Sequence, residues 1–138
     1  MTGHAERESA FVHAQRVTPP RVLLANLEPM ARLGMRRVLA EGGIEVVGDE
    51  ENAGGVVGQV GRLLPDAVVL GFDGKASLEL SERVRTVAPE TKVILWTRDE
   101  SAMDVFDPGS AEPRRIHLGA SNALLRELST DQSSSGGE

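Results

Sequence analysis

The stretch "PDAVVLGFDG", residues 65–74, holds the most informative residues for chemistry in this sequence. Its apolar run, residues 67–70, predicts a short buried strand that ends at Gly71. In open α/β sheets the carboxyl ends of the strands are where ligands and reactive side chains gather. Gly71 supplies no side chain there, but Asp73 follows two positions later. A carboxylate at this place would serve as a nucleophile or a metal ligand.

Other signatures of catalysis are absent from the sequence. The three histidines, His4, His13 and His117, lie far apart and have no metal-ligand spacing. The chain has no cysteine, which excludes a thiol nucleophile, a thiolate metal site and a disulfide. It has neither a glycine-rich phosphate loop nor a G-x-S-x-G nucleophile motif. We therefore expect no enzymatic activity, no metal and no cofactor.

Composition limits the classes of partner. The 138 residues suit one domain, and a 40% hydrophobic content suffices for a core. The net charge of −6 argues against nucleic-acid binding, and the basic pairs 36–37 and 114–115 suit solvated helix faces or strand ends. No apolar run is long enough to be a signal peptide or to span a membrane. We expect a soluble, cytoplasmic protein.

Strand and helix patterns alternate along the chain. Apolar runs predict parallel strands at 21–25, 44–48, 67–70, 93–96 and 115–118. Helical spacing lies between them, and in the first helix Met30, Leu33, Val38 and Leu39 approximate one stripe. Further helices are predicted over 54–64, 76–88 and 123–128. This alternation predicts a doubly wound α/β fold, with helices on both faces of a five-stranded parallel sheet.

The ends of the chain differ from its centre. Residues 1–20 are polar and finish in Pro19-Pro20, and we predict a flexible N-terminal arm. Residues 129–138 form a polar, low-complexity tail predicted to be disordered. The folded domain is therefore predicted over residues 21–128.

The centre of the chain resembles a known signalling domain. "RVLLANLEPMARLGMRRVLAEGGIEVVGDEENAGGVVGQVGRLLPDAVVL" and the later "VAPETKVILWT" resemble the receiver domain of bacterial two-component response regulators. The similarity is to the branch whose receivers precede a helix-turn-helix output domain. It extends from Arg21 to Leu128, and it is weak between Gly71 and Ser77 and after Thr97. The resemblance implies a receiver-like, flavodoxin-like fold.

The resemblance also implies the position of a phosphorylation site. In the family, two acidic residues and an aspartate hold Mg²⁺, the aspartate accepts the phosphoryl group, and a lysine and a hydroxyl contact it. The acidic pair falls here on Asn26 and Leu27, the acceptor on Gly71 and the lysine on Gly119 or its neighbour. Only the switch hydroxyl is kept, as Thr97. We expect a degenerate pocket that neither holds Mg²⁺ nor accepts a phosphoryl group.

Asp73 is the remaining candidate for a phosphoacceptor. The loop after Gly71 is about two residues shorter than in the family, which would bring Asp73 toward the pocket. Asp73-Gly74 is also an ordinary turn dipeptide, and we favour the turn. Asp49 and Glu50, after the second strand, are expected to be solvated rather than metal ligands.

The segment "SAMDVFDPGSAEP", residues 101–113, departs from the family's fourth helix. Asp107-Pro108-Gly109 stops a helix, so we expect this helix to be shortened or irregular. Its apolar residues then either fill the core or form an exposed contact. The possible interaction surface consists of Met103, Val105, Phe106, Arg114 and Arg115. Trp96, the only tryptophan, is expected in the core or along the emptied pocket.

These features together predict an aspartate-less pseudo-receiver without an output domain. We expect it to act in bacterial signalling or transcriptional control by binding a protein, either a response regulator, a sensor kinase or a transcription factor. A homodimer is also possible. One alternative is a small-molecule sensor whose ligand fills the cleft freed by Leu27, Gly71 and Gly119. A second alternative is phosphotransfer through Asp73.

Overall fold

The computed structural model describes residues 18–71, 74–96, 101–117 and 123–129. Within these ranges six strands form one sheet, ordered β2-β1-β3-β4-β5-β6. The strands are β1 (Arg21–Ala25), β2 (Glu45–Glu50), β3 (Ala67–Gly71), β4 (Lys92–Trp96), β5 (Ala102–Phe106) and β6 (Arg114–His117). The helices are α2 (Pro29–Glu41), α3 (Ala53–Leu63), α4 (Lys75–Val87) and α5 (Ala123–Ser129). No helix in the described ranges is long and apolar enough to cross a membrane.

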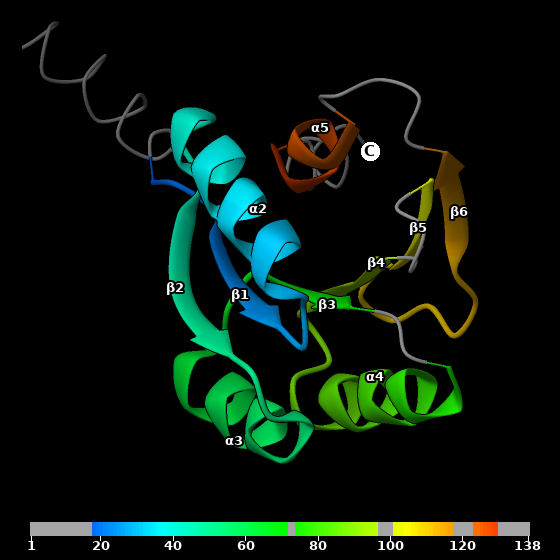
Figure 1. Cartoon of the computed structure of the whole chain (residues 1–138). Helices are drawn as coiled ribbons and strands as arrows, with labels where there is room; N and C mark the ends of the chain where they lie inside the picture. Colours follow the sequence, from blue (N-terminus) through cyan, green and yellow to red (C-terminus); the bar gives the residue numbers. More distant parts are fainter. Residues whose placement is uncertain (1–17, 72–73, 97–100, 118–122, 130–138) are drawn as a thin grey trace, which may run out of the picture.

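Helices cover both faces of the sheet, as the alternating pattern predicts. In Figure 1, α2 and α5 lie above the sheet and α3 and α4 lie below it. Strands β2, β1, β3 and β4 are parallel, and β1, β3 and β4 are buried on both faces. Alternate residues pack on opposite faces: Leu24 and Val69 against α2 and α5, Leu23 and Val68 against α3 and α4. The α/β, receiver-like fold class is therefore confirmed.

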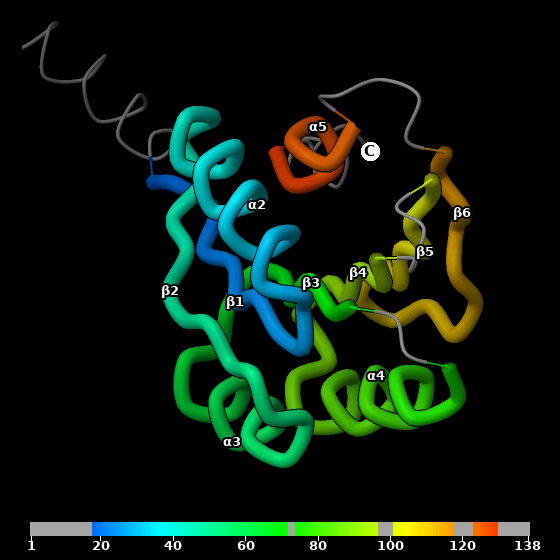
Figure 2. The backbone as a smooth tube through the Cα atoms, in the orientation of Figure 1, coloured from blue at the N-terminus to red at the C-terminus, as the bar shows by residue number. Residues whose placement is uncertain are grey.

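The prediction of a purely parallel five-stranded sheet is wrong. The segment expected to be an irregular fourth helix forms β5, which pairs antiparallel with β4 and with β6. Figure 2 shows β5 and β6 together at the end of the sheet away from β2. The sheet is therefore mixed, with six strands, and β6 is separated from β4 by one strand.

The residues of β5 explain why it is a strand. Met103 and Val105 pack on the face covered by α2 and α5, whereas Phe106 packs on the opposite face. Such alternation matches the two-residue period of a strand rather than the period of a helix. The turn that follows contains Gly109, whose φ of +80° lies in the left-handed region that glycine adopts without strain. Pro108 and Gly109 therefore connect two strands here.

Helix α2 buries a different stripe from the one that the sequence suggests. Its buried residues are Met35 and Leu39, spaced four apart, which pack against β1 and β3. Met30 is 80% exposed, Leu33 65% and Val38 41%. Apolar side chains are therefore present on two sides of this helix, and only one of them faces the core.

Charged side chains join α5 to the sheet at the amino end of β4. Lys92 is only 3% exposed, and its Nζ lies 2.8 Å from Oε2 of Glu127 in α5. Arg114 contacts the same carboxylate oxygen at 2.5 Å and Oδ2 of Asp107 at 2.6 Å. The hydrogen bond and charge of Arg114 lower the pKa of Asp107. Burial raises the pKa of Glu127, but hydrogen bonds from Arg114 and Lys92 outweigh it and lower that pKa overall.

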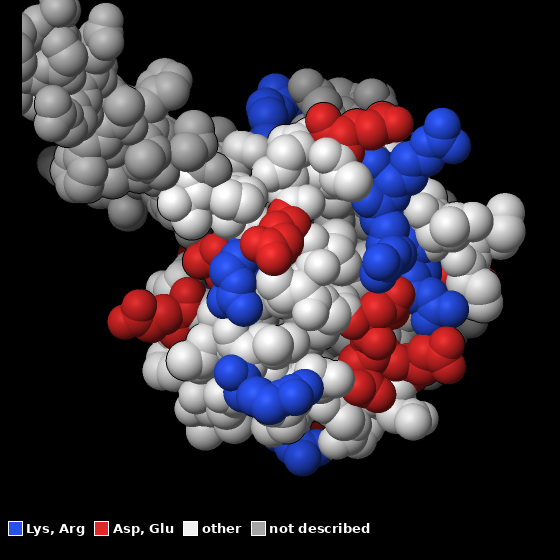
Figure 3. Space-filling view, turned by 90° about the vertical axis from the view of Figure 1, so that its left-hand side faces the viewer, with Lys and Arg blue, Asp and Glu red and all other residues white. Residues whose placement is uncertain are grey.

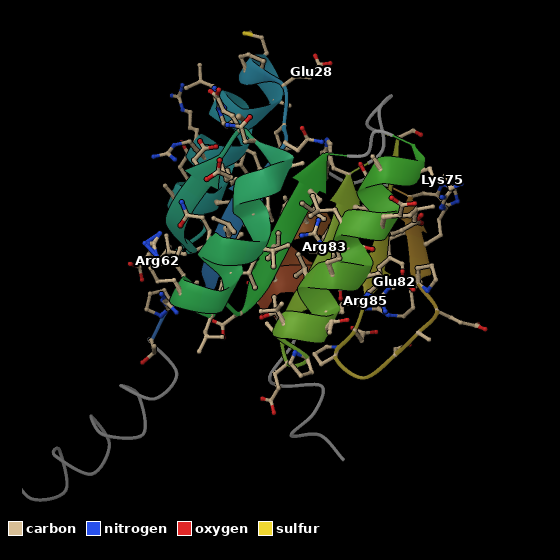
Figure 4. All side chains as sticks on the ribbon, turned by 90° about the horizontal axis from the view of Figure 1, so that it is seen from below. Glu28, Arg62, Lys75, Glu82, Arg83 and Arg85 are labelled. Atoms are coloured by element: carbon tan, nitrogen blue, oxygen red, sulfur yellow. The ribbon has the colours of Figure 1, made fainter. Side chains whose placement is uncertain are left out.

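Removal of the buried ammonium group tests this network, and the chain provides a matched control in its only other lysine. We expect Lys92→Met to lower the free energy of unfolding by about 2 kcal/mol, because the Glu127 carboxylate loses the cation of Lys92. Lys75 is exposed at the start of α4 (Figure 4), and Lys75→Met should change stability by less than about 0.5 kcal/mol. Urea unfolding at neutral pH measures both.

The same network makes the effect of Lys92 depend on pH. Because the folded-state pKa values of Asp107 and Glu127 are lowered, their contribution is complete above the unfolded carboxyl pKa of about 4. It is lost as the pH falls through the folded-state values. The difference in stability between wild type and Lys92→Met should thus be smaller at about pH 3 than at pH 7. An equal difference at both pH values would show that Lys92 acts through packing alone.

Candidate functional site

The candidate site lies at the carboxyl ends of β1 and β3, where the strand order reverses. Asn26 and Leu27 follow β1, and Gly71 is the last residue of β3. The structure thus brings together three of the residues implied by the resemblance. Asp73, Thr97 and Gly119 lie outside the described residues, so their predicted roles stay predictions.

The polar groups of Asn26 hold the loop after β1 in place. Its φ of +55° lies in the left-handed region, which asparagine tolerates better than most residues. Its backbone N–H donates to the carbonyl of Glu50 at 2.9 Å, and its side-chain Nδ2 donates to the carbonyl of Gly71 at 3.4 Å. The hydroxyl of Ser77, in the first turns of α4, donates to the same Gly71 carbonyl at 3.1 Å. These bonds link the ends of β1, β2 and β3 to α4.

The space beside Gly71 is occupied by the backbone of this loop. A Cβ atom at Gly71 would overlap the carbonyl oxygen of Asn26. It would also lie 3.0 Å from the carbonyl carbon of Asn26 and 3.3 Å from Cα of Leu27. All three are backbone atoms, which cannot move aside by a change of rotamer. Position 71 therefore has no room for an aspartate, or even for a methyl group, unless the loop moves.

The residues that the structure describes at this site do not fit a Mg²⁺ ion. Leu27 is 8% exposed and belongs to the hydrophobic cluster beneath α2. Asn26 is a neutral amide whose Nδ2 already faces the Gly71 carbonyl. Mg²⁺ requires oxygen ligands and is usually held by at least one carboxylate. Throughout the described part of the chain, no group of three or more His, Cys, Asp or Glu residues could hold a metal ion.

The acidic residues at the end of β2 are bound to neighbouring side chains. Asp49 lies 3.5 Å from Nε of Arg32 and 3.4 Å from Nη1 of Arg36, both in α2. Glu50 accepts hydrogen bonds from the backbone of Asn52 and from the side chain of Gln59. Figure 3 shows basic side chains gathered beside acidic ones on this side of the molecule. Asp49 and Glu50 are thus half-buried structural partners rather than solvated residues, and they do not point to a metal site.

A separate apolar groove lies beside the candidate site, between α2 and α5. Its volume is about 310 Å³, and every lining residue is apolar: Met30, Ala31, Gly34, Met35, Val38, Trp96 and Leu124. Trp96 packs against the core beneath α2, and its buried Nε1 has no hydrogen-bond partner among the described residues. The sequence does not reveal this groove, because the predicted core stripe of α2 includes two of its lining residues, Met30 and Val38. The four-residue spacing of Met30, Gly34 and Val38 was the available signal.

The residues proposed as an interaction surface have structural roles. Met103, Val105 and Phe106 are buried, so of the two alternatives they fill the core and leave no exposed contact. Arg114 bonds to Asp107 and Glu127, as described above. Arg115 faces Asp104 across the β5–β6 pair, with two hydrogen bonds of 2.7 and 2.8 Å. The arginines of β6 are therefore bound to acidic side chains of the same domain.

Comparisons with known proteins support the fold. No family model matches the chain, and no curated protein matches its sequence. Among solved structures, the chain is similar to the crystal structure of a two-component response regulator of the LuxR family from Aurantimonas sp. SI85-9A1. The TM-score is 0.52 at 24% identity, and the match covers 58% of this chain and 59% of that chain. At this identity the likeness establishes a shared fold.

Alanine substitutions at two glycines test whether the site is closed. We expect Gly71→Ala to lower the free energy of unfolding by about 2–3 kcal/mol, because its Cβ meets immobile backbone. Gly58→Ala is the control: its Cβ has open space in α3, so helix propensity should raise stability by about 0.5–1 kcal/mol. Urea unfolding measures both variants. A Gly71→Ala protein as stable as wild type would show that the space beside β3 is open.

Proposed function

We propose that this chain is a receiver-like regulatory module that does not accept a phosphoryl group and acts by binding another protein. The observation that supports this most strongly is the overlap between a Cβ at Gly71 and the Asn26 carbonyl oxygen. The space beside Gly71, where the resemblance places the phosphoacceptor, is here occupied by backbone. The likeness of the fold to a response regulator supports a role in signalling.

The chemistry of phosphoryl transfer explains why this observation matters. A receiver forms an acyl phosphate when a carboxylate attacks the phosphorus of a donor while Mg²⁺ neutralises the phosphoryl oxygens. Position 71 supplies no carboxylate, and the nearby side chains that the structure describes supply no set of metal ligands. The Asn26 carbonyl oxygen also carries partial negative charge, which repels a phosphoryl group. Each of these factors alone disfavours the reaction.

The hydrogen bonds of the loop suggest how the module works. Asn26 and Ser77 tie the ends of three strands and α4 together without any bound phosphate. The domain would then hold one conformation at this end of the sheet. Its activity would depend on its abundance and on its partner, which we propose to be a response regulator, a sensor kinase or a transcription factor of the cytoplasm.

The alternative of a ligand in the emptied cleft loses support at its proposed location. That cleft required space beside Gly71 and Leu27, where the structure has backbone and packed core. A small molecule would instead have to use the apolar groove at Trp96. The alternative of phosphotransfer through Asp73 concerns a residue outside the described ranges. The intact-mass comparison of wild type with Asp73→Asn, described next, tests it.

Intact-mass measurement after incubation with Mg²⁺ and acetyl phosphate tests the proposal. We expect no added phosphoryl group on wild type or on Asp73→Asn, whereas a conventional receiver treated in parallel gains one. A stoichiometric adduct on wild type would contradict the proposal. If that adduct disappears in Asp73→Asn, Asp73 is the acceptor.

A further inference from the structure

Gly34, in the middle of α2, has no structural reason to be glycine within the described part of the chain. A Cβ at this position meets no atom within 4 Å. By contrast, a Cβ at Gly42, Gly48 or Gly55 would lie closer than 3.0 Å to a neighbouring side chain. Glycine inside a helix costs about 0.5–1 kcal/mol relative to alanine. Close approach of another backbone would offset that cost.

The neighbours of Gly34 distinguish it from the other open glycines. Met30 and Val38 lie four residues before and after it, and both are substantially exposed, as is Leu33. Gly58 in α3 also has open space around its Cβ, but the residues four positions away are Gly54 and Arg62. Among the described helices, only α2 combines an open glycine with exposed large apolar side chains in the same row.

The row formed by Met30, Gly34 and Val38 is symmetric about its glycine. If two α2 helices pack antiparallel around a two-fold axis at Gly34, Met30 of each copy lies opposite Val38 of the other. Rows of four-residue spacing pack into one another at a crossing angle of about −50°, and glycine at the crossing point lets the backbones approach. The surface is thus complementary to itself, as a two-fold interface requires.

The charges around this row also favour an antiparallel second copy. The flanking arginines are already paired: Arg32 and Arg36 with acidic residues of the β2 end, and Arg37 with Glu41. The row itself is uncharged. Glu41 lies in the last turn of α2, where its own helix dipole disfavours a carboxylate; at the amino end, Glu28 is the N-cap residue, and the first turn itself has no acidic residue. Antiparallel packing directs Glu41 toward the positive end of the other helix.

We propose that a second copy of this chain binds the exposed face of α2, forming a two-fold dimer in which the α2 helices cross at Gly34. The contact covers the row and continues over the groove between α2 and α5, which Met30, Gly34 and Val38 also line. This inference goes beyond the proposed function, because self-association requires neither the loss of phosphotransfer nor a different protein partner.

Analytical ultracentrifugation of the full chain over a range of concentrations tests the proposal, with glutamine introduced at two open helical glycines. Wild type and the control Gly58→Gln should form dimers that dissociate on dilution. Gly34→Gln should weaken the dimer at least about tenfold, because its side chain separates the crossing helices. Both variants should keep or raise the melting temperature, since glutamine favours helix more than glycine does. This separates loss of contact from loss of folding.

Disulfide trapping tests whether Met30 of one copy lies opposite Val38 of the other. Because the chain has no cysteine of its own, only the introduced cysteines can form a crosslink. The double variant Met30→Cys/Val38→Cys should form a covalent dimer on mild oxidation. The two cysteines of one helix are about 12 Å apart and cannot bond to each other. Each single variant faces no thiol at the predicted register and should not crosslink.

Three results would overturn the proposal. The first is a wild-type chain that stays monomeric at every concentration. The second is a Gly34→Gln variant that dimerises as wild type does. The third is a double-cysteine variant that crosslinks no more than the single ones. None of them would affect the intact-mass test, so the two proposals fail separately.

Discussion

The contact between the end of β3 and the loop after β1 determines what this fold can do. In a parallel sheet the loop that leaves one strand passes close to the end of its neighbour, and the side chain at that end needs space. Here the Asn26 carbonyl takes that space, so Gly71 is required for packing. The left-handed backbone of Asn26 and the bonds that the Gly71 carbonyl accepts from Asn26 and Ser77 follow from the same arrangement. The site is thus a closed junction rather than an open pocket that lacks one residue.

Ion pairs in other parts of the molecule also keep this end of the sheet in place. Ion pairs of α2 with the end of β2 bind the helix that follows the loop. At the opposite end of β4, Lys92, Arg114 and Glu127 join α5 to the sheet. The antiparallel β5 replaces a helix on the side where the resemblance places a fourth helix. The row formed by Met30, Gly34 and Val38 in α2 remains exposed and apolar, and this is where we place self-association.

Much of the fold could be predicted, because strands buried on both faces leave continuous apolar runs that sequence alone reveals. β5 was missed because the Pro108-Gly109 turn marks the end of an element without saying whether it is a helix or a strand. The alternation of Met103 and Val105 was the available signal. The site was located by resemblance, but its closure was not predictable, since it depends on where the carbonyl of Asn26 lies relative to β3. The exposure of Met30 was not predictable either, because it depends on which side of α2 packs against the sheet.

The most direct measurement of the central claim is the amide NMR spectrum of the protein during titration with Mg²⁺ and beryllofluoride, which mimics a bound phosphoryl group. The backbone amides of Asn26, Gly71 and Ser77 report on the junction between β1, β3 and α4. We predict that these resonances do not shift, because the described residues of the junction offer neither ligands for the metal nor space for the anion. Saturable shifts centred on these residues would show a working phosphorylation site and contradict the account.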